Sequence, residues 1–133
     1  GGGGAAGGQR VRAQLLALAG EALAPGPWQQ ETVAALNSAA AALLRAGDPL
    51  AACAAWARLF KKCAAERLTH PDLATAHLNR CGALLRLELW PEALWDSLKA
   101  ERLARERAAA DPLRAAAHVA RACGRRGQAL LGL

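Results

Sequence analysis

The stretch HPDLATAHLNRCGALLRLELWPEALWDSLKA, residues 70–100, contains two runs rich in Ala and Leu, each opened by a proline. Because proline is tolerated in the first turn of a helix and excluded from its interior, Pro71 and Pro91 each predict a helix start. Ala and Leu are strong helix formers. The stretch therefore predicts two consecutive helices, over 71–88 and 91–109.

Prolines also recur at regular intervals on both sides of this stretch. Prolines recur at intervals of 22, 22, 20 and 21 residues, at Pro27, Pro49, Pro71, Pro91 and Pro112. Asp48 and Asp111 each precede a proline, and an aspartate at that position can cap a helix N-terminus. The remaining expected helices are a leading helix over 9–24 and helices over 28–46, 49–68 and 112–133.

The composition agrees with a helical protein, because Tyr and Met are absent and Phe occurs once in 133 residues. The aromatic and β-branched residues that favour strands are therefore scarce. Two proline intervals make one helical hairpin of about 41 to 44 residues, which is typical of stacked helix pairs. The sequence predicts an all-α fold, a right-handed α-solenoid of antiparallel helix hairpins.

The first eight residues, GGGGAAGG, have the composition of a flexible linker. We therefore expect residues 1–8 to be disordered and the chain to be part of a longer protein. No apolar run approaches the roughly 18 residues that a membrane-spanning helix needs. The N-terminus also lacks the charged and then hydrophobic pattern of a secretory signal.

The four cysteines show no CxxC pairing. Cys53 and Cys63 would lie about 15 Å apart along one helix, which is too far for a disulfide. We interpret all four cysteines as small buried thiols in a reducing compartment, and we expect an intracellular, cytoplasmic protein.

The residues NRCGALLRLELWPEALWDSLKA at 79–100 resemble one tetratricopeptide repeat (TPR), from the middle of its first helix through its second. In the register of that family, small residues stand where helices cross closely, and larger ones fill the space beside them. The resemblance implies that the small positions are Cys81, Ala93 and Ala100, and that the larger ones are Leu84 and Trp90.

The same register extends to both sides. In the preceding hairpin Gly47 stands at the turn, where the second repeat departs from the family with Glu88. The resemblance assigns packing positions in this first hairpin to Ala40, Leu43, Ala52, Trp56 and Leu59. The stretch RRGQALLGL at 125–133 resembles the first helix of a third repeat, with Gly127 in the small position and Leu130 in the large one.

The spacing of equivalent turns exceeds the roughly 34 residues of the ordinary repeat and is typical of a long-period form of about 42 residues. The start HPD at 70–72 is similar to the repeats of kinesin-light-chain-type proteins. The resemblance implies one TPR-like domain over 9–133. Its parts are a leading helix over 9–24, repeat one over 28–68, repeat two over 71–109 and a partial repeat three over 112–133.

Members of this family hold partners in a concave groove, and one co-chaperone subgroup grips the acidic C-terminal tail of a heat-shock chaperone with a carboxylate clamp. Asn79 matches the asparagine of that clamp in its second repeat, and Arg121 and Arg125 match the basic pair in its third. Guanidinium groups pair with carboxylates through directional, charge-assisted hydrogen bonds. The first repeat departs from the clamp, because Asn37 and Ala41 stand where it has lysine and asparagine.

Other chemistry is less well supported by the residues. His77 and Cys81, four apart on one helix, offer two metal ligands, but two ligands do not make a site. We expect no metal, and we interpret His118 as a helix-surface residue. Nucleophile elbow, phosphate-binding loop and dinucleotide fingerprint are absent from the sequence, so we expect no enzyme activity, no catalytic residue and no cofactor.

The net charge is +6, and residues 101–126 hold seven arginines against three acids. Such a basic region favours an acidic peptide, a nucleic acid or an anionic membrane surface. The shortage of residues that can stack on bases argues against nucleic-acid binding, because only Trp28 and Trp95 are expected to be free to meet a base. We expect a protein-interaction scaffold or adaptor that binds a protein or peptide partner. The alternatives are a structural subunit of a larger assembly and a basic nucleic-acid-binding repeat.

Overall fold

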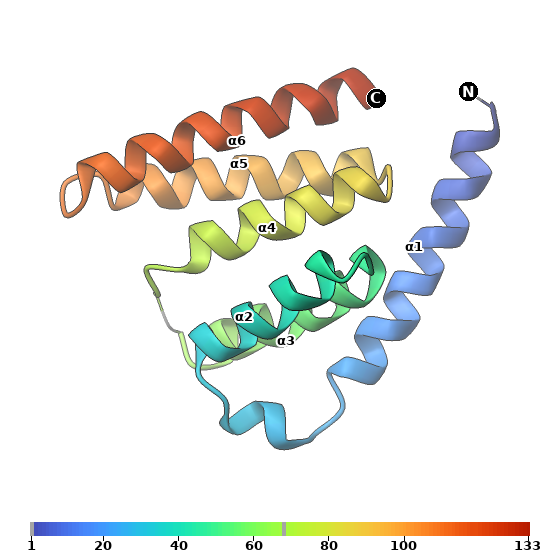
Figure 1. The fold of residues 1–133 in the computed structure, drawn as a ribbon, viewed down its shortest axis with the longest axis horizontal. Helices are drawn as coiled ribbons and strands as arrows, with labels where there is room; N and C mark the ends of the chain where they lie inside the picture. The colour runs from blue at the N-terminus through green and yellow to red at the C-terminus, as the bar shows by residue number, and fades with distance from the viewer. Residues whose placement is uncertain (1, 68) are drawn as a thin grey trace. The chain divides into compact units, whose positions relative to one another are not determined.

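The computed structural model describes residues 2–67 and 69–133, and in these residues it contains six α-helices, one short 3-10 helix and no strand (Figure 1). The prediction of an all-α protein is confirmed. The chain divides into two compact units, Gly1–His70 and Pro71–Leu133.

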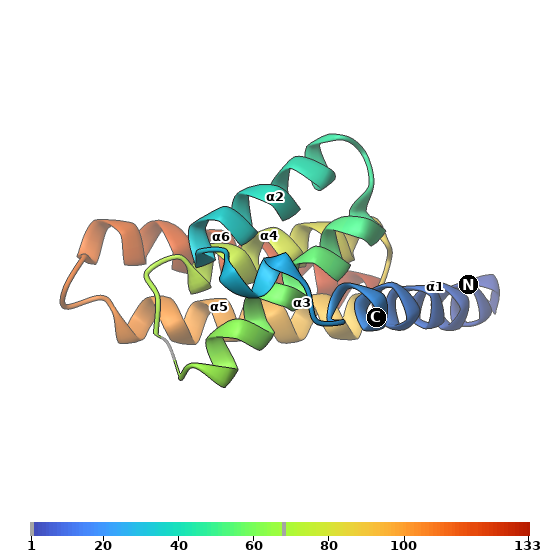
Figure 2. The ribbon, with the colours of Figure 1, turned by 90° about the horizontal axis from the view of Figure 1, so that it is seen from below.

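The first unit is a helical hairpin with a further helix packed on it. The hairpin consists of α2 (Val33–Arg45) and α3 (Pro49–Ala65), and α1 (Gly2–Ala22) packs against α3. The 3-10 helix η1 (Pro27–Gln30) lies between α1 and α2 in the chain (Figure 2).

Helix α1 includes residues 2–8, where the sequence predicts a disordered linker; residue 1 lies outside the described residues. The stretch that follows is rich in Ala and Leu. An existing helix extends by one hydrogen bond per added residue, whereas starting a helix is costly. Extension through glycine therefore costs only about 1 kcal/mol per residue relative to alanine.

The prolines mark helix starts in three of five cases. Pro49 and Pro112 open α3 and α6, after Asp48 and Asp111 whose Oδ1 atoms accept hydrogen bonds from backbone N–H groups of the first turn. Pro91 is the second residue of α5. The predicted capping by both aspartates is confirmed.

The other two prolines precede their helices instead of opening them. Pro71 lies in a turn, and α4 begins at Leu73. Pro27 opens η1, and α2 begins only at Val33, where Thr32 Oγ1 accepts a hydrogen bond from the N–H of Ala35 at 3.1 Å. The predicted helix over 28–46 is therefore wrong at its start, because the Thr32 cap and not the proline fixes that N-terminus.

The core of the first unit contains Trp56 and Leu59 with no exposed surface, together with buried Ala40 and Ala52, as the family register implies. Leu43 is an exception and is 37% exposed. Leu43 lines an open depression between α1 and the α2–α3 hairpin, so part of its side chain stays in contact with solvent.

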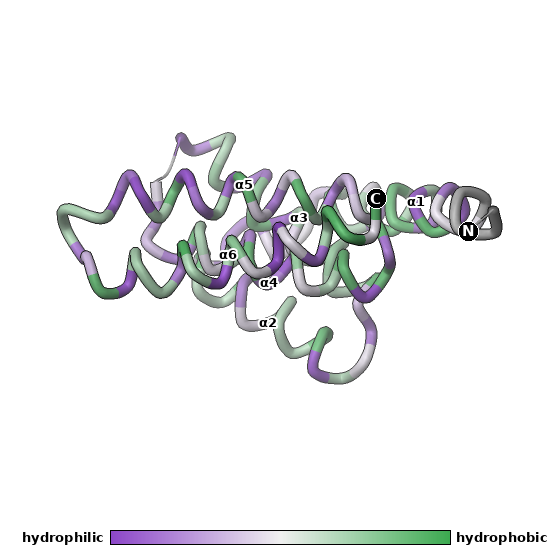
Figure 3. The backbone as a smooth tube through the Cα atoms, turned by 90° about the horizontal axis from the view of Figure 1, so that it is seen from above, coloured by the Kyte–Doolittle hydropathy of each residue, from purple (hydrophilic) through white to green (hydrophobic). Residues whose placement is uncertain are grey.

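The second unit consists of three helices: α4 (Leu73–Arg86), α5 (Trp90–Glu106) and α6 (Pro112–Gly132). Helix α5 packs against both α4 and α6, and α4 also contacts α6 (Figure 1). Hydrophilic and hydrophobic residues alternate along α6 (Figure 3). One face of α6 can therefore be buried while the other carries charge.

Small residues let the three helices approach closely. Leu78, Ala100 and Ala122, one from each helix, form a buried cluster. Cys81, Leu84 and Ala93 are also buried, as the resemblance implies. This close packing of small side chains compensates for the shortage of large ones.

Leu130 does not take the buried position that the resemblance assigns to it, and it is 53% exposed. The buried face of α6 runs through Ala115, His118, Ala122 and Ala129. Leu130 follows Ala129 directly, and one residue turns a helix by about 100°. Its side chain therefore faces away from the core.

Candidate functional site

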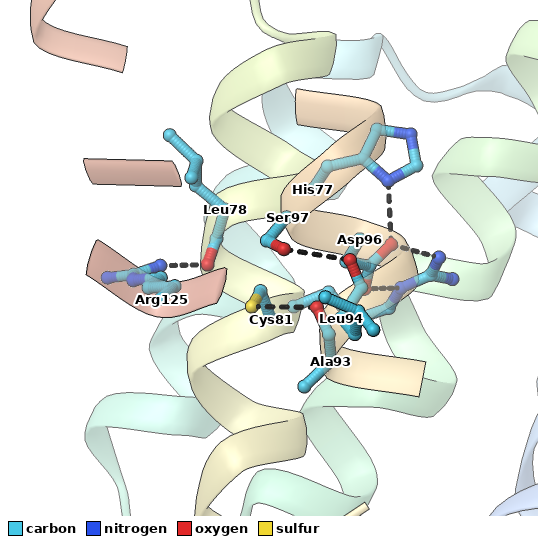
Figure 4. A network of polar contacts seen from close by, with 9 residues as sticks. His77, Leu78, Cys81, Ala93, Leu94, Asp96, Ser97 and Arg125 are labelled. Atoms are coloured by element: carbon cyan, nitrogen blue, oxygen red, sulfur yellow. Dashed lines mark hydrogen bonds and ion pairs between the residues drawn. The ribbon is translucent and has the colours of Figure 1, made fainter. Parts of the chain in front are cut away.

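The predicted clamp residues of repeats two and three lie on the two helices that meet, α4 and α6. Asn79 is half-buried on α4, Arg121 is exposed on α6, and Arg125 lies one turn further along α6. The guanidinium of Arg125 donates from Nη1 to the carbonyl oxygen of Leu78, the residue before Asn79 (Figure 4). The structure therefore brings these three positions to one helix pair.

Gly82 lies beside the Arg125 side chain. A Cβ atom at Gly82 would lie 3.4 Å from Nη1 of Arg125, which is close to van der Waals contact. Burial lowers the pKa of Arg125, and the neighbouring charge of Arg121 lowers it further. Arg125 is thus partly desolvated and engaged by the backbone, whereas Arg121 is exposed to solvent.

Beyond Arg125 the same helix pair forms an open groove of about 520 Å³. Its apolar lining comes from Leu85, Trp90 and Leu131, and its polar lining from Arg86, Arg125 and Gln128. Among the described lining residues there is no carboxylate. The groove therefore combines apolar surface with positive charge.

Trp90 contributes to this groove instead of filling the core, which corrects the packing role that the resemblance implies. Its neighbour Leu89 is fully buried, whereas Trp90 is half-buried. The end of α6 approaches the Trp90 ring so closely that a Cβ atom at Gly132 would lie 2.1 Å from it. The Trp90 ring lies against this turn of α6, and Leu89 takes the fully buried position.

Asn37, at one of the first-repeat positions of the clamp, makes a hydrogen bond within the first hairpin. Asn37 Oδ1 accepts a hydrogen bond of 2.9 Å from Nε1 of the buried Trp56. Because a buried indole N–H needs an acceptor, Asn37 is explained by packing within the hairpin.

Trp28 and Trp95, the two tryptophans predicted to be free to meet a base, differ in their exposure to solvent. Trp95 is 56% exposed, as expected. Trp28 is only 6% exposed and donates from Nε1 to the carbonyl oxygen of Ala24 at 2.8 Å, so the prediction is wrong for Trp28.

A buried ionic cluster, which the sequence analysis did not identify, joins α4 to α5 (Figure 4). Asp96 is fully buried and accepts two hydrogen bonds from Arg80, at 2.6 and 2.7 Å. Its Oδ1 also lies 2.8 Å from Nδ1 of His77. Burial lowers the pKa of His77, and together with the charges of Arg80 and Lys99 it outweighs the hydrogen bond and charge of Asp96, which raise this pKa.

One signal could have pointed to this cluster. Asp96 lies at helical spacing between Ala93 and Ala100, on the stripe of α5 that small residues mark as buried. A buried carboxylate requires a paired cation. Its partners, 16 and 19 residues earlier in the chain, follow no local motif.

His77 and Cys81, the two possible metal ligands, each contact another group of the chain. His77 is engaged by Asp96, and the Cys81 Sγ donates to the carbonyl oxygen of Ala93 at 3.2 Å. Burial raises the pKa of Cys81 to about 11, which disfavours the thiolate that binds metals. Within residues 2–67 and 69–133, no three His, Cys, Asp or Glu side chains are placed to share a metal ion.

His118 and Cys123 depart from their predicted surroundings. His118 is 8% exposed, and its Nε2 lies 3.2 Å from Thr75 Oγ1, so it is not the predicted surface residue. It is buried because it lies on the face of α6 that meets α4 and α5. Cys53, Cys63 and Cys81 are buried as predicted, whereas Cys123 is half-buried beside Glu101 and Arg126.

The fold and this groove define an all-α protein built from helical hairpins, with a basic and partly apolar surface on α4 and α6. No protein-family model matches the chain, and no curated protein or solved structure matches it significantly. None of the helices in the described residues has the length and apolar character that a membrane crossing requires.

Proposed function

We propose that this chain is a non-enzymatic protein-interaction module of TPR-like hairpins, and that its α4 and α6 surface binds an acidic peptide. The observation that carries the proposal is the lining of the groove, which combines two arginines and a glutamine with Leu85, Trp90 and Leu131 and contains no carboxylate among the described residues. Arginine forms directional hydrogen bonds with carboxylates, and exposed aromatic and aliphatic surface binds apolar side chains.

The ligand that fits this lining is a short peptide with an apolar side chain and acidic residues near a free C-terminus. The apolar side chain would lie against Trp90 and Leu131. The terminal carboxylates would meet Arg121 and Asn79, with Arg125 between the two parts. Arg125 already donates one hydrogen bond to Leu78, so its remaining N–H groups are the ones available to a ligand.

Fluorescence anisotropy with a labelled peptide of this kind tests the proposal. We expect an affinity on the order of 1–100 μM, weakened at least about tenfold by Arg121→Ala because a charge-assisted hydrogen bond is lost. Arg125→Ala should abolish binding. The matched control is Arg102→Ala, which removes an exposed arginine from α5 and should leave the affinity unchanged.

Two further results would contradict the peptide proposal. One is no binding at millimolar peptide. The other is equal binding of a peptide whose acidic residues are replaced by amides. Tight binding of an oligonucleotide with a steep dependence on salt would favour the nucleic-acid alternative instead.

The exposed leucines of α6 favour a second candidate, a structural subunit of a larger assembly. Leu113 and Leu131 are 85% and 89% exposed. Such side chains can dock against an apolar partner without any free carboxylate. This candidate predicts a fixed partner whose binding is lost in Leu113→Glu or Leu131→Glu and is insensitive to Arg121→Ala.

A further inference from the structure

A second cavity lies at the opposite end of the three-helix unit, where α4 and α6 begin and α5 ends. Small apolar residues that include Ala74 and Ala104 line it, together with Arg107, Asp111, Arg114 and His118. The cavity has a volume of about 50 Å³. Since one water needs at least about 10–15 Å³, it has room for a group of several non-hydrogen atoms.

One carboxylate, that of Asp111, lines this cavity, and Asp72 lies beside it as the partner of Arg114. Asp111 accepts a hydrogen bond from the backbone N–H of Arg114 as the cap of α6. Asp72 forms a 2.8 Å ion pair with Nη2 of Arg114. Arg107, directly after α5, is exposed and faces the same cavity.

The charged groups around His118 create a positive local potential. Burial is the largest cause of the lowered pKa of His118, and the charges of Arg114 and Arg121 lower it further. Each of these two charges acts more strongly than Asp111 or Asp72, which raise the pKa. The ring is 8% exposed, lines the cavity and contacts Thr75. An anion in the cavity would relieve this repulsion and favour a protonated ring that donates to it.

A helix end adds to this potential. Helices α4 and α6 both begin at the cavity, and Asp72, which precedes α4, makes no side-chain cap hydrogen bond. The N-terminus of α6 is met by the Asp111 carboxylate, whereas the N-terminus of α4 has no side-chain cap. The α4 N-terminus and the basic side chains therefore favour the same sign of ligand charge.

We propose that this cavity is a binding site for a phosphate-sized oxyanion, held by Arg107, Arg114 and His118. The two sources of this chemistry are free inorganic phosphate and a phosphate monoester. The site shares no lining residue with the α4 and α6 groove. Arg121, a proposed contact of the peptide, acts on this site only through its charge on His118.

Isothermal titration calorimetry with inorganic phosphate, at constant ionic strength in sodium chloride, tests this site. We expect saturable binding that Arg107→Gln weakens about tenfold, because one charge-assisted hydrogen bond is lost. Arg102→Gln on α5 is the matched control and should bind as the wild type does. Both arginines are exposed, so neither substitution disturbs the core.

A parallel titration with O-phosphoserine separates the two sources. Tighter binding of phosphate identifies the free ion as the ligand, and tighter binding of O-phosphoserine identifies a monoester. No heat at about 10 mM of either ligand overturns the proposal, as does equal weakening by Arg107→Gln and Arg102→Gln. Amide resonances shifted by phosphate should include those of Ala74 and Arg114, and shifts confined to the C-terminal half of α6 would also overturn it.

Discussion

Glu88 occupies, between α4 and α5, the same left-handed backbone conformation that Gly47 occupies between α2 and α3, with φ of 57° and 88°. The hydrogen bonds match as well. The N–H of Gly47 bonds to Leu44 and that of Asp48 to Leu43, and the N–H of Glu88 bonds to Leu85 and that of Leu89 to Leu84. This is the Schellman pattern of helix C-termini. The two hairpins thus share one turn geometry, 41 residues apart.

Because a side chain destabilises the left-handed conformation, Glu88→Gly should stabilise the protein by about 1 kcal/mol. Gly47→Ala should destabilise it by a similar amount. Urea unfolding followed by tryptophan fluorescence measures both. Glu88→Ala is the control, since it removes the carboxylate and keeps the strain, and an equal gain in Glu88→Ala and Glu88→Gly would mean that backbone strain is not the cause.

The helical hairpins could be predicted because their signals are local. Asp48 and Pro49 define a helix start by capping and φ restriction alone, and the structure places α3 there. Gly47 similarly marks a turn that the structure contains. Glu88 carries no turn preference, and only the register of the family resemblance placed a turn at its position.

The site was less predictable because it depends on contacts between helices. Sequence reasoning placed Asn79, Arg121 and Arg125 on helices that do meet. It could not show that Arg125 is engaged by a backbone carbonyl, nor that Trp90 lines a groove while Leu89 is buried. A side chain turns by about 100° about the helix axis per residue, so an error of one position in register moves it to another face. The contact of Arg125 depends in addition on how α6 packs against α4.

Stability should fall as the pH decreases from 7.5 to 5.5, because the folded state lowers the pKa of His77 and of His118 below the ordinary value of 6.5. The unfolded chain then binds protons that the folded chain does not. This contribution to stability is therefore complete above the unfolded pKa of about 6.5 and is lost as the pH falls from there through the lower folded pKa values. The slope is at most about 1.4 kcal/mol per pH unit for each histidine.

Urea unfolding at several pH values measures this slope. The double variant His77→Gln, His118→Gln should flatten the dependence between pH 7.5 and 5.5, because His70 is then the only histidine left in the sequence. An unchanged slope in the double variant would assign the pH dependence to other groups.

Arg80→Ala should destabilise the protein by about 3 kcal/mol, because it removes the bidentate partner of the fully buried Asp96. The substitution also removes a guanidinium that lies 5.9 Å from the Trp95 ring centre. The control is Arg102→Ala, whose side chain is 61% exposed in its ion pair with Glu106 and should contribute less than about 1 kcal/mol.

A second variant separates the charge from the packing in this cluster. Asp96→Asn keeps the shape of the side chain and removes the charge, so it should restore part of the stability when combined with Arg80→Ala. Additive losses in the double variant would contradict a direct coupling between the two residues.

Gly132→Ala should destabilise the end of α6, because a Cβ atom there would lie 2.1 Å from the Trp90 ring and either the ring or the last helical turn must move. Overpacking of this kind costs about 1–3 kcal/mol. Amide hydrogen exchange should show lost protection confined to the end of α6. The matched control is Gly127→Ala on the same helix, where a Cβ atom meets nothing within 4 Å and the higher helix propensity of alanine should add up to about 1 kcal/mol. If Gly132→Ala stabilises the helix as Gly127→Ala does, the close approach of α6 to Trp90 is wrong, and with it the apolar end of the groove.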